Sequence, residues 1–135
     1  MPELTCTVVT PEQTALETKA DFVALPLFDG EIGIAANHSP LIGRLGYGEM
    51  RIKQGERSVS YYVDGGFVQV ADNVVAVLTS RAVPSASLDV AAAEKQLAAA
   101  LARPGNTPEL QEIRERAVAQ ARAQLHVAKH ARGKA

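Results

Sequence analysis

The sequence predicts an α+β chain, with an N-terminal β-sandwich in residues 1–84 and a C-terminal antiparallel two-helix hairpin in residues 85–135. In the first part, short runs of Val, Ile and aromatic residues alternate with polar residues, and turn signals separate them at roughly eight- to twelve-residue intervals. All three Tyr and all three Phe lie before residue 68, whereas Ala dominates the second part. This change of period and composition predicts a compact β module with a separate helical appendage.

The first predicted strand covers residues 4–9, where Leu4, Cys6 and Val8 alternate with their neighbours, as in a half-buried strand. Further strands are predicted at residues 13–20, 22–27, 31–35, 45–53, 57–63, 67–70 and 74–78. Gly, Asn and Asp mark the connections between them, because these residues adopt turn conformations at low cost. The marked positions are Asp29-Gly30, the loop Asn37–Pro40, Gln54-Gly55 and Asp72-Asn73. Asp64-Gly65-Gly66 predicts either another turn or a corner between two sheets.

After residue 84 the apolar residues recur at intervals of three and four, which is the period of a helix. Ser87 is expected to cap the first helix, with Asp89 in its first turn. The predicted stripe of this helix is Val90, Glu94, Leu97 and Leu101. Thr107 is expected to cap the second helix, with Pro108 at its first helical position. The stripe of the second helix is Leu110, Ile113, Ala117, Ala121, Leu125 and Ala128.

The break between the two helices, Arg103–Asn106, is short enough to predict an antiparallel hairpin. Its seam is mostly Ala, which allows close backbones but buries little area. A buried methyl-sized group contributes about 0.8 kcal/mol, whereas a buried Leu contributes about 1.5–3 kcal/mol. The hairpin is therefore predicted to open more easily than one with a Leu seam.

Composition excludes several classes of protein. The net charge is −1, but residues 1–84 hold six basic and ten acidic residues, whereas residues 85–135 hold eight and five. This balance, and a basic helix without interleaved aromatic residues, argue against nucleic acid as a partner. The single Cys6 forbids an internal disulfide and suits a reducing compartment. We find no signal peptide, and no apolar run approaches the roughly 18 residues of a spanning helix.

Residues 29–52, DGEIGIAANHSPLIGRLGYGEMRI, resemble the signature of the epsilon subunit of F-type ATP synthase. Further segments resemble that family in the same order along the chain. They are residues 4–12, LTCTVVTPE, residues 61–82, YYVDGGFVQVADNVVAVLTSRA, residues 88–97, LDVAAAEKQL, and the Arg-bearing second helix. Together these segments cover nearly the whole chain.

The resemblance implies a non-catalytic rotor subunit, with the chemistry of ATP on other subunits of the complex. The sandwich would sit on the gamma subunit and touch the ring of c subunits, peripheral to the cytoplasmic face of the cell membrane. The hairpin would either fold against the sandwich or extend along gamma toward the alpha and beta subunits. The extended form slows ATP hydrolysis in many members of this family.

Two groups of residues are candidates for partner contacts. Glu31, expected on a tight turn, and His38, in a loop, fall within the signature that the resemblance places near the ring. The alternative is that Glu31 is solvated and His38 stabilises its own loop. Arg114, Arg116 and Arg122 lie too early in the second helix for its dipole to explain them. The resemblance implies that they meet acidic segments of the catalytic subunits.

No cofactor is expected. Family members that bind ATP on the hairpin carry Ile or Leu, Asp, two variable residues, Arg and Ala, and here the matching run begins at Leu88. Asp89 is present, but Ala92 stands where the Arg would be, so the guanidinium that pairs with phosphate is missing. We expect weak ATP binding or none, and Asp89 is sufficiently explained as an acid at a helix start.

Other readings of the residues have less support. His126 and His130 are spaced for zinc on one helix face, but no third ligand is near, so no metal site is expected. Asp29 and Glu31 resemble an acid–base pair without a second cluster to form a cleft. Two further classes stay open, a free-standing module for acidic partners and a small enzyme that uses Asp29, Glu31 or His38. The enzyme reading predicts loss of turnover on Glu31→Gln.

Overall fold

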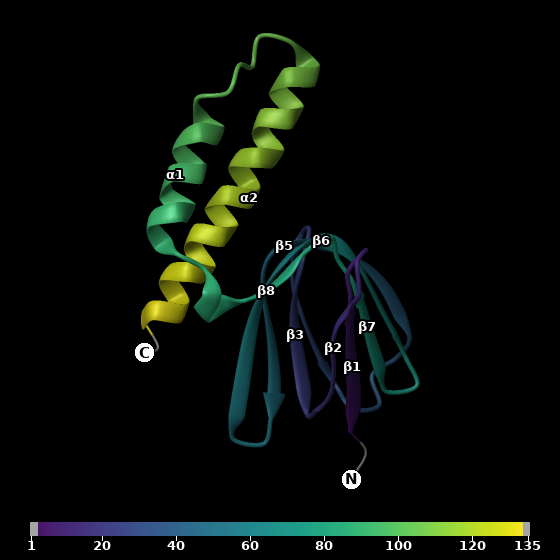
Figure 1. The fold of residues 1–135 in the computed structure, drawn as a ribbon. Coiled ribbons are helices and arrows are strands. Elements are labelled where there is room, and N and C mark those ends of the chain that lie inside the picture. The colour runs from purple at the N-terminus through teal and green to yellow at the C-terminus, as the bar shows by residue number, and fades with distance from the viewer. Residues whose placement is uncertain (1–2, 134–135) are drawn as a thin grey trace. The chain divides into compact units, whose positions relative to one another are not determined.

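The computed structural model describes residues 3–133 and confirms the predicted fold class, a β-sandwich followed by two helices (Figure 1). The chain divides into two compact units, Met1–Pro84 and Ser85–Ala135. The strands of the first unit are β1 Leu4–Val9, β2 Thr14–Ala20, β3 Phe22–Leu27, β4 Gly30–Ala35, β5 Leu41–Gln54, β6 Arg57–Ala71, β7 Val74–Leu78 and β8 Ala82–Pro84. The second unit contains the 3₁₀ turn η1 Ser85–Ser87 and the helices α1 Val90–Leu101 and α2 Pro108–Gly133.

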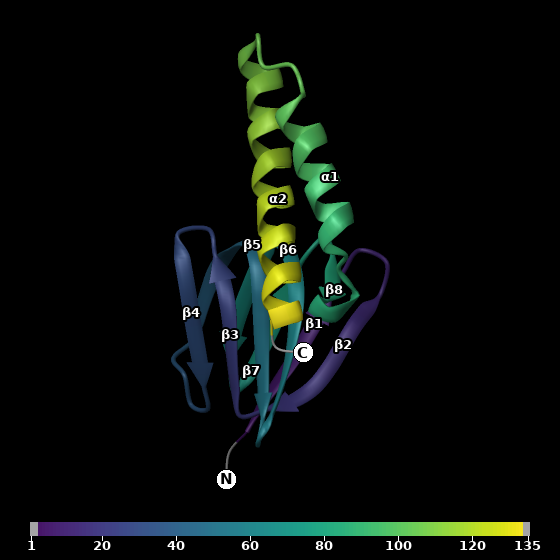
Figure 2. The same ribbon diagram turned by 90° about the vertical axis from the view of Figure 1, so that its left-hand side faces the viewer.

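Hydrogen bonds join the strands in the order β2-β1-β7-β6-β5-β3-β4, with β8 on β6. Strand β1 is parallel to β7, and the other pairs are antiparallel. The long strands β5 and β6 pair with each other on both sides of Gly46 and Gly65. One half of β6 pairs with β7 and the other half with β8. The two long strands therefore run through both layers, and the sheet folds over on itself as a sandwich (Figure 2).

Asp64-Gly65-Gly66 forms the corner between the two layers and does not reverse the chain. Gly65 and Gly66 have φ angles of +72° and +105°, which side chains with a Cβ rarely adopt. The chain bends there without leaving the ladder, since Asp64 still pairs with Tyr47. The predicted strand at 57–63 is therefore too short, because the glycines mark a bend within one strand.

The other predicted hairpin turns are confirmed. Asp72 and Asn73 have φ angles of +50° and +62°, as in a tight turn with both central residues left-handed. Gly55 follows β5 with a φ of +63°. The short strand β8 was not predicted, because three residues are too few for a period to be visible in the sequence.

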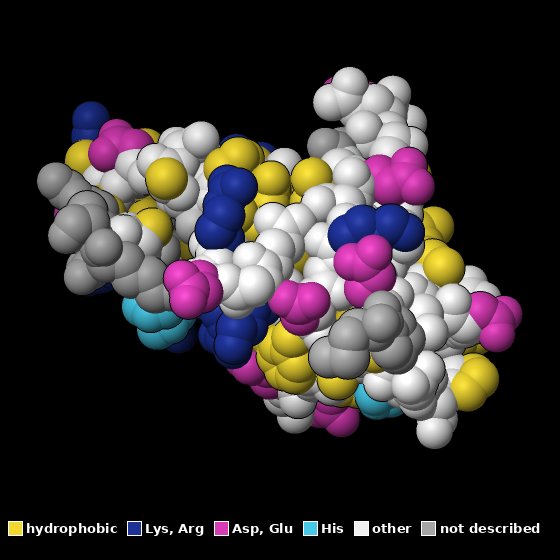
Figure 3. Space-filling view, turned by 90° about the horizontal axis from the view of Figure 1, so that it is seen from below, with side chains coloured by type: hydrophobic (Ala, Val, Ile, Leu, Met, Phe, Trp, Pro, Cys, Tyr) yellow, Lys and Arg dark blue, Asp and Glu magenta, His cyan; other side chains and the backbone are white. Residues whose placement is uncertain are grey.

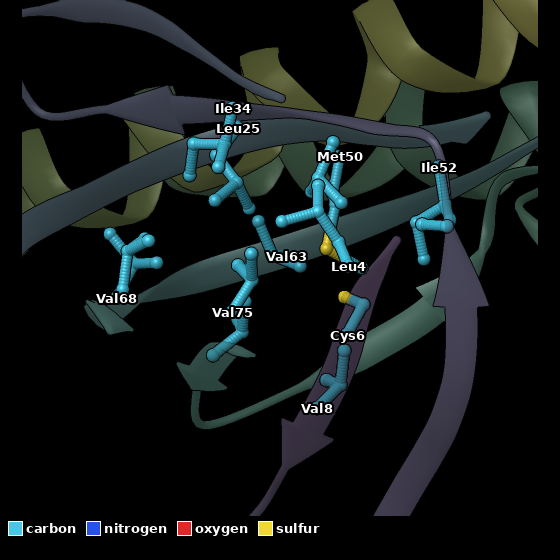
Figure 4. Close-up of a cluster of buried hydrophobic side chains, with 14 of the residues drawn as sticks. Leu4, Cys6, Val8, Leu25, Ile34, Met50, Ile52, Val63, Val68 and Val75 are labelled. Atoms are coloured by element: carbon cyan, nitrogen blue, oxygen red, sulfur yellow. The ribbon is translucent and has the colours of Figure 1, made fainter. Parts of the chain in front are cut away.

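The sandwich core confirms the alternation predicted for the first strand. Leu4, Cys6 and Val8 are at most 1% exposed, and Figure 4 shows Leu4 and Cys6 turned toward Met50. The buried cluster comprises Leu4, Cys6, Val8, Ala20, Val23, Leu25, Ile34, Leu45, Met50, Ile52, Val63, Val68, Val70, Val75 and Val77. Every strand from β1 to β7 contributes to it, so the core lies between the two layers.

We predict that Cys6 resists alkylation as long as the sandwich is folded. Burial raises the pKa of its thiol to about 12, and only the thiolate is nucleophilic. At pH 8, iodoacetamide should modify the native chain roughly a thousandfold more slowly than the chain unfolded in guanidinium. Mass spectrometry of quenched samples measures both rates. Comparable rates would show that the core around β1 opens readily in the native chain.

The helix boundaries correct one prediction and confirm another. Asp89, and not Ser87, is the N-cap of α1, and its carboxylate accepts hydrogen bonds from the backbone N–H groups of Ala91 and Ala92, both at 3.3 Å. Ser87 belongs to η1, because the chain makes a 3₁₀ turn before the helix begins. Thr107 caps α2 as predicted, its hydroxyl oxygen accepting from the Leu110 N–H at 3.1 Å.

Helices α1 and α2 pack side by side as an antiparallel hairpin (Figure 1). The seam is rotated from the predicted stripe of α1: Ala93 and Ala100 are buried, whereas Glu94 and Leu101 are exposed. On α2, Ala121 is buried but Ile113 is 51% exposed. The small Ala side chains face the partner helix because they allow the closest approach of the two backbones, and the larger apolar residues lie at the margins.

Candidate partner-binding surfaces

Large apolar side chains are exposed on one outer surface of the sandwich. They are Phe28, Ile42, Phe67, Val74 and Leu78, which are 65%, 77%, 58%, 41% and 50% exposed, and we call this surface the apolar face. The members come from neighbouring strands, since Phe67 of β6 pairs with Leu78 of β7 on one side. On its other side Phe67 pairs with Arg44 of β5. Exposed large apolar side chains on neighbouring strands of one face are typical of a protein-binding site.

Arg44 places a cation within the apolar face. Its guanidinium lies 5.6 Å from the centre of the Phe28 ring, in a cation–π contact. The Phe28 N–H also donates to the Arg44 carbonyl oxygen at 3.1 Å. These contacts hold Phe28 against β5, although the side chain is in a turn. A fixed aromatic ring loses little conformational entropy when a partner covers it.

His38 lies in the loop that borders this face, just before β5. Its Nδ1 is 2.8 Å from the Ser39 carbonyl oxygen, which is a contact within its own loop. The loop is attached to the β6–β7 turn, because the Asn37 N–H donates to Asn73 Oδ1 at 2.6 Å and Asn73 Nδ2 donates to Asn37 Oδ1 at 3.4 Å. The half-buried His38 is thus held next to the strands that carry Ile42 and Val74.

Glu31 is not on a turn but in β4, next to its first residue, whereas His38 follows the last residue of that strand, Ala35. Arg51 of β5 donates to Glu31 at 2.8 Å and to Glu49 at 3.2 Å, and Glu49 accepts from Ser60 at 2.7 Å. Partial burial acts to lower the pKa of Arg51, but the hydrogen bonds to Glu49 and Glu31 raise it above its usual value. The sequence grouped Glu31 with His38, and the structure separates them.

The three candidate arginines of α2 differ in their surroundings. Arg114 is half-buried, and its Nε and Nη2 donate to the Leu101 carbonyl oxygen at 3.3 and 3.2 Å. Arg116 and Arg122 are exposed. A shallow cavity of about 360 Å³ in the hairpin is lined by Leu101, Arg114, Glu115, Val118, Ala119 and Arg122. Arg114 and Arg122 thus face one cavity, whereas Arg116 does not line it.

The residues considered for a nucleotide or a metal ion have contacts within the helices. Both carboxylate oxygens of Asp89 cap α1, and Ala92 has no group that could pair with phosphate. The rings of His126 and His130 stack with their centres 6.4 Å apart. Between residues 3 and 133, no group of three or more His, Cys, Asp or Glu side chains could hold a metal ion.

On the face shown in Figure 3, acidic and basic side chains are interspersed.

Comparison with known proteins identifies the family. A family model for the β-sandwich domain of the ATP synthase delta/epsilon chain matches residues 3–85. The ATP synthase epsilon chain of Rhodopirellula baltica is 52% identical over 124 residues, which cover 92% of this chain and 97% of that protein. The chain belongs to the ATP synthase epsilon chain family. It is accordingly a non-catalytic subunit and not an enzyme.

Other similar proteins agree with this assignment. The ATP synthase epsilon chain of Rubrobacter xylanophilus is 36% identical over 107 residues, 79% of this chain and 73% of the relative. A chain in the Euglena gracilis mitochondrial ATP synthase structure (OSCP/F1/c-ring) has a TM-score of 0.85 at 24% identity, covering 96% of this chain and 83% of its own length. A chain in the Tetrahymena thermophila structure (central stalk/c-ring) has a TM-score of 0.66 at 15% identity, with coverage of 93% and 96%. At 24% and 15% identity, these two chains show only that the fold is shared with this chain.

Sequence reasoning missed the apolar face. Its signal is visible in Val74–Leu78, VVAVL, where apolar residues occupy both alternating positions of a strand. In a half-buried strand one of the two sets should be polar. The apolar outer set, Val74 and Leu78, is the part of the sequence that signals the apolar face. No described helix is long and apolar enough to cross a membrane.

Proposed function

We propose that this chain is a central-stalk subunit of the rotor of F-type ATP synthase, and that it couples proton flow through the membrane ring to ATP synthesis in the catalytic head. The family assignment supports the part of the proposal that places the chain in an ATP synthase complex. The apolar face is the single observation that carries the proposal, because it indicates a permanent protein partner for the sandwich. As part of this complex the chain would be peripheral to the membrane, on its cytoplasmic face.

The apolar face would be covered by the gamma subunit. Interfaces of obligate subunits are more apolar than the rest of a protein surface, with aromatic residues and Arg enriched at their centre. Phe28, Phe67 and Arg44 fit this composition. His38 borders the same surface, so we assign it to the rim of the gamma interface.

Glu31 would face the ring of c subunits. It lies at the other end of β4 from His38, and Arg51 holds its carboxylate in place. An oriented, exposed carboxylate can accept hydrogen bonds from polar loops of the ring. This part of the proposal rests on the family resemblance and on the exposure of Glu31.

The hairpin would restrain ATP hydrolysis by extending toward the alpha and beta subunits. Its Ala seam buries little apolar area, so few apolar contacts between the two helices are lost when the hairpin opens. Moving such an element from 1:99 to 99:1 requires about 5.5 kcal/mol of differential contacts. Arg116 and Arg122, which are exposed in the closed hairpin, would supply part of this by meeting acidic segments. With Ala92 in place of Arg, nucleotide on the hairpin would contribute little or nothing.

The experiment that tests this proposal compares the native complex with one in which this chain lacks residues 85–135. We predict that truncation raises ATP hydrolysis at least about fivefold, a change typical of a coupling energy between two sites, while assembly and proton pumping persist. ATPase rate, subunit content and acidification of vesicles are measured on the same preparation.

Each outcome has a distinct meaning. If the truncated chain assembles and hydrolysis is unchanged, the regulatory role of the helices is wrong, although the sandwich still binds the complex. If the full chain fails to assemble with the complex, the rotor assignment is wrong and a free-standing binding module takes its place. A charge variant of an exposed residue at the β5–β6 turn, Glu56→Gln, is the matched control and should behave as the native chain does.

A further inference from the structure

We propose that Arg114 is a latch: its hydrogen bonds to the Leu101 carbonyl oxygen keep the hairpin closed beside the Arg103–Asn106 loop, and they must break before the Nε–Nη2 edge of the guanidinium can bind an acidic partner. The inference deepens the proposed function, because it names the contact that regulates the hairpin. It rests on that function only for the identity of the partner, since the latch itself lies within the isolated chain.

The geometry of the contact is that of a helix cap supplied by the neighbouring helix. Two nitrogens of Arg114 on α2 donate to the carbonyl oxygen of Leu101, the last residue of α1, at 3.3 and 3.2 Å. The last carbonyls of a helix have no partner within it. The N–H groups of Ala102 and Arg103 are directed to Ala98 and Ala100 instead.

Charge strengthens this contact. The C-terminus of a helix carries a partial negative charge, so a cation is stabilised there. Hydrogen bonds from a charged donor are also stronger than neutral ones. Arg114 therefore joins the negative end of α1 to the side of α2. Gly105 of the connecting loop lies close to the same side chain, since a Cβ added to this glycine would lie 3.5 Å from Arg114 Cδ.

Apolar packing between α1 and α2 is weak near the loop, so the Arg114 hydrogen bonds matter most at this end of the hairpin. Leu101 and Ile113 are 43% and 51% exposed, so neither fills the seam. The buried residue of α1 nearest the loop is Ala100, which offers one methyl group. With so little apolar area at this end, the Arg114 hydrogen bonds to Leu101 are a polar link between α1 and α2 that opening must break.

The Leu101 carbonyl oxygen occupies the Nε–Nη2 edge of the Arg114 guanidinium, so a partner carboxylate can pair with both donors of that edge only after the Leu101 carbonyl has been released. An acidic partner would therefore compete with α1 for Arg114. Arg122, exposed on the same cavity, is available without any opening. This arrangement makes Arg122 suited to a first contact and Arg114 to a contact formed only after the hairpin has opened.

Hydrogen exchange of the full chain, without partners, tests the latch. Arg114→Met removes the charge and the donors but keeps a long side chain of similar helix propensity. We expect exchange of the α1 amides to rise at least about tenfold, most steeply near Leu101 and least near Val90. Arg114→Lys should give a smaller rise, because Lys keeps the charge without the planar pair of donors.

Arg116→Met is the matched control, since Arg116 lies exposed on the same helix, and it should leave exchange unchanged. The latch is wrong if Arg114→Met exchanges like this control, or if exchange rises uniformly over α1 and α2. Because no partner is present, such a failure leaves the proposed rotor function intact. Unchanged hydrolysis on truncation would instead contradict the proposed regulation and leave the latch in place.

Discussion

Gly66→Ala should unfold or severely destabilise the sandwich, at a cost of about 3 kcal/mol or more. A Cβ on Gly66 would overlap the backbone carbonyl oxygen of Leu78 and would lie 3.0 Å from the Cα of Thr79. Both obstacles are backbone atoms, so no rotamer change can relieve the overlap. The φ angle of +105° adds strain for any residue with a side chain. The β6–β7 ladder would have to separate at the corner of the sandwich.

Urea denaturation followed by Tyr fluorescence measures this effect, because all three Tyr lie in the sandwich and the chain has no Trp. Gly55→Ala is the matched control. Gly55 also has a positive φ, +63°, but an added Cβ would meet nothing within 4 Å, so its cost should be limited to about 1–2 kcal/mol. Equal losses for the two variants would show that the Leu78 backbone yields and that only the φ angle matters.

Phe67→Asp should weaken docking of the folded sandwich on its proposed partner, the gamma subunit. Phe67 is 58% exposed, so the substitution leaves the core intact. It places a charge in the middle of the apolar face, between Leu78 and Arg44. Central aromatic residues of an interface contribute about 2 kcal/mol or more, so affinity should fall at least about 30-fold. Calorimetric titration of the full chain into purified gamma subunit measures it.

Phe22→Asp provides the control for this docking experiment. Phe22 is also an exposed aromatic residue of the sandwich, 39% exposed, but it begins β3 and pairs with Lys53. Phe22 is six residues from Phe28 of the apolar face, which is about 20 Å of extended chain along β3. Phe22→Asp should therefore bind gamma as the native chain does. If both variants lose binding, the apolar face is not the specific docking surface.

Local patterns predicted the elements well because they depend on neighbouring residues. The alternation of Leu4, Cys6 and Val8 identified β1, and Thr107 with Pro108 identified the start of α2. One error concerns the choice between two neighbouring residues at the start of α1. Ser87 and Asp89 are both good capping residues, and the 3₁₀ turn that precedes α1 selects Asp89.

The candidate site was predicted less completely. Glu31 and His38 are close in sequence, but the extended strand β4 places them at opposite ends. Arg114, Arg116 and Arg122 were grouped by charge order, and the structure separates Arg114 through its bond to Leu101. The cross-strand neighbours of Phe67 could not be read from the sequence, because strand register joins residues that are far apart along the chain.

The sequence by itself determined the class of fold, the sites of the turns and the family, because these follow from period, turn chemistry and motif order. Only the tertiary structure decided that β5 and β6 pass through both layers, that five apolar side chains form one outer surface, and that Arg114 caps the neighbouring helix. The physical reason is the range of the interactions. A period is a property of adjacent residues, whereas exposure, register and a cap supplied by another helix depend on segments brought together by folding.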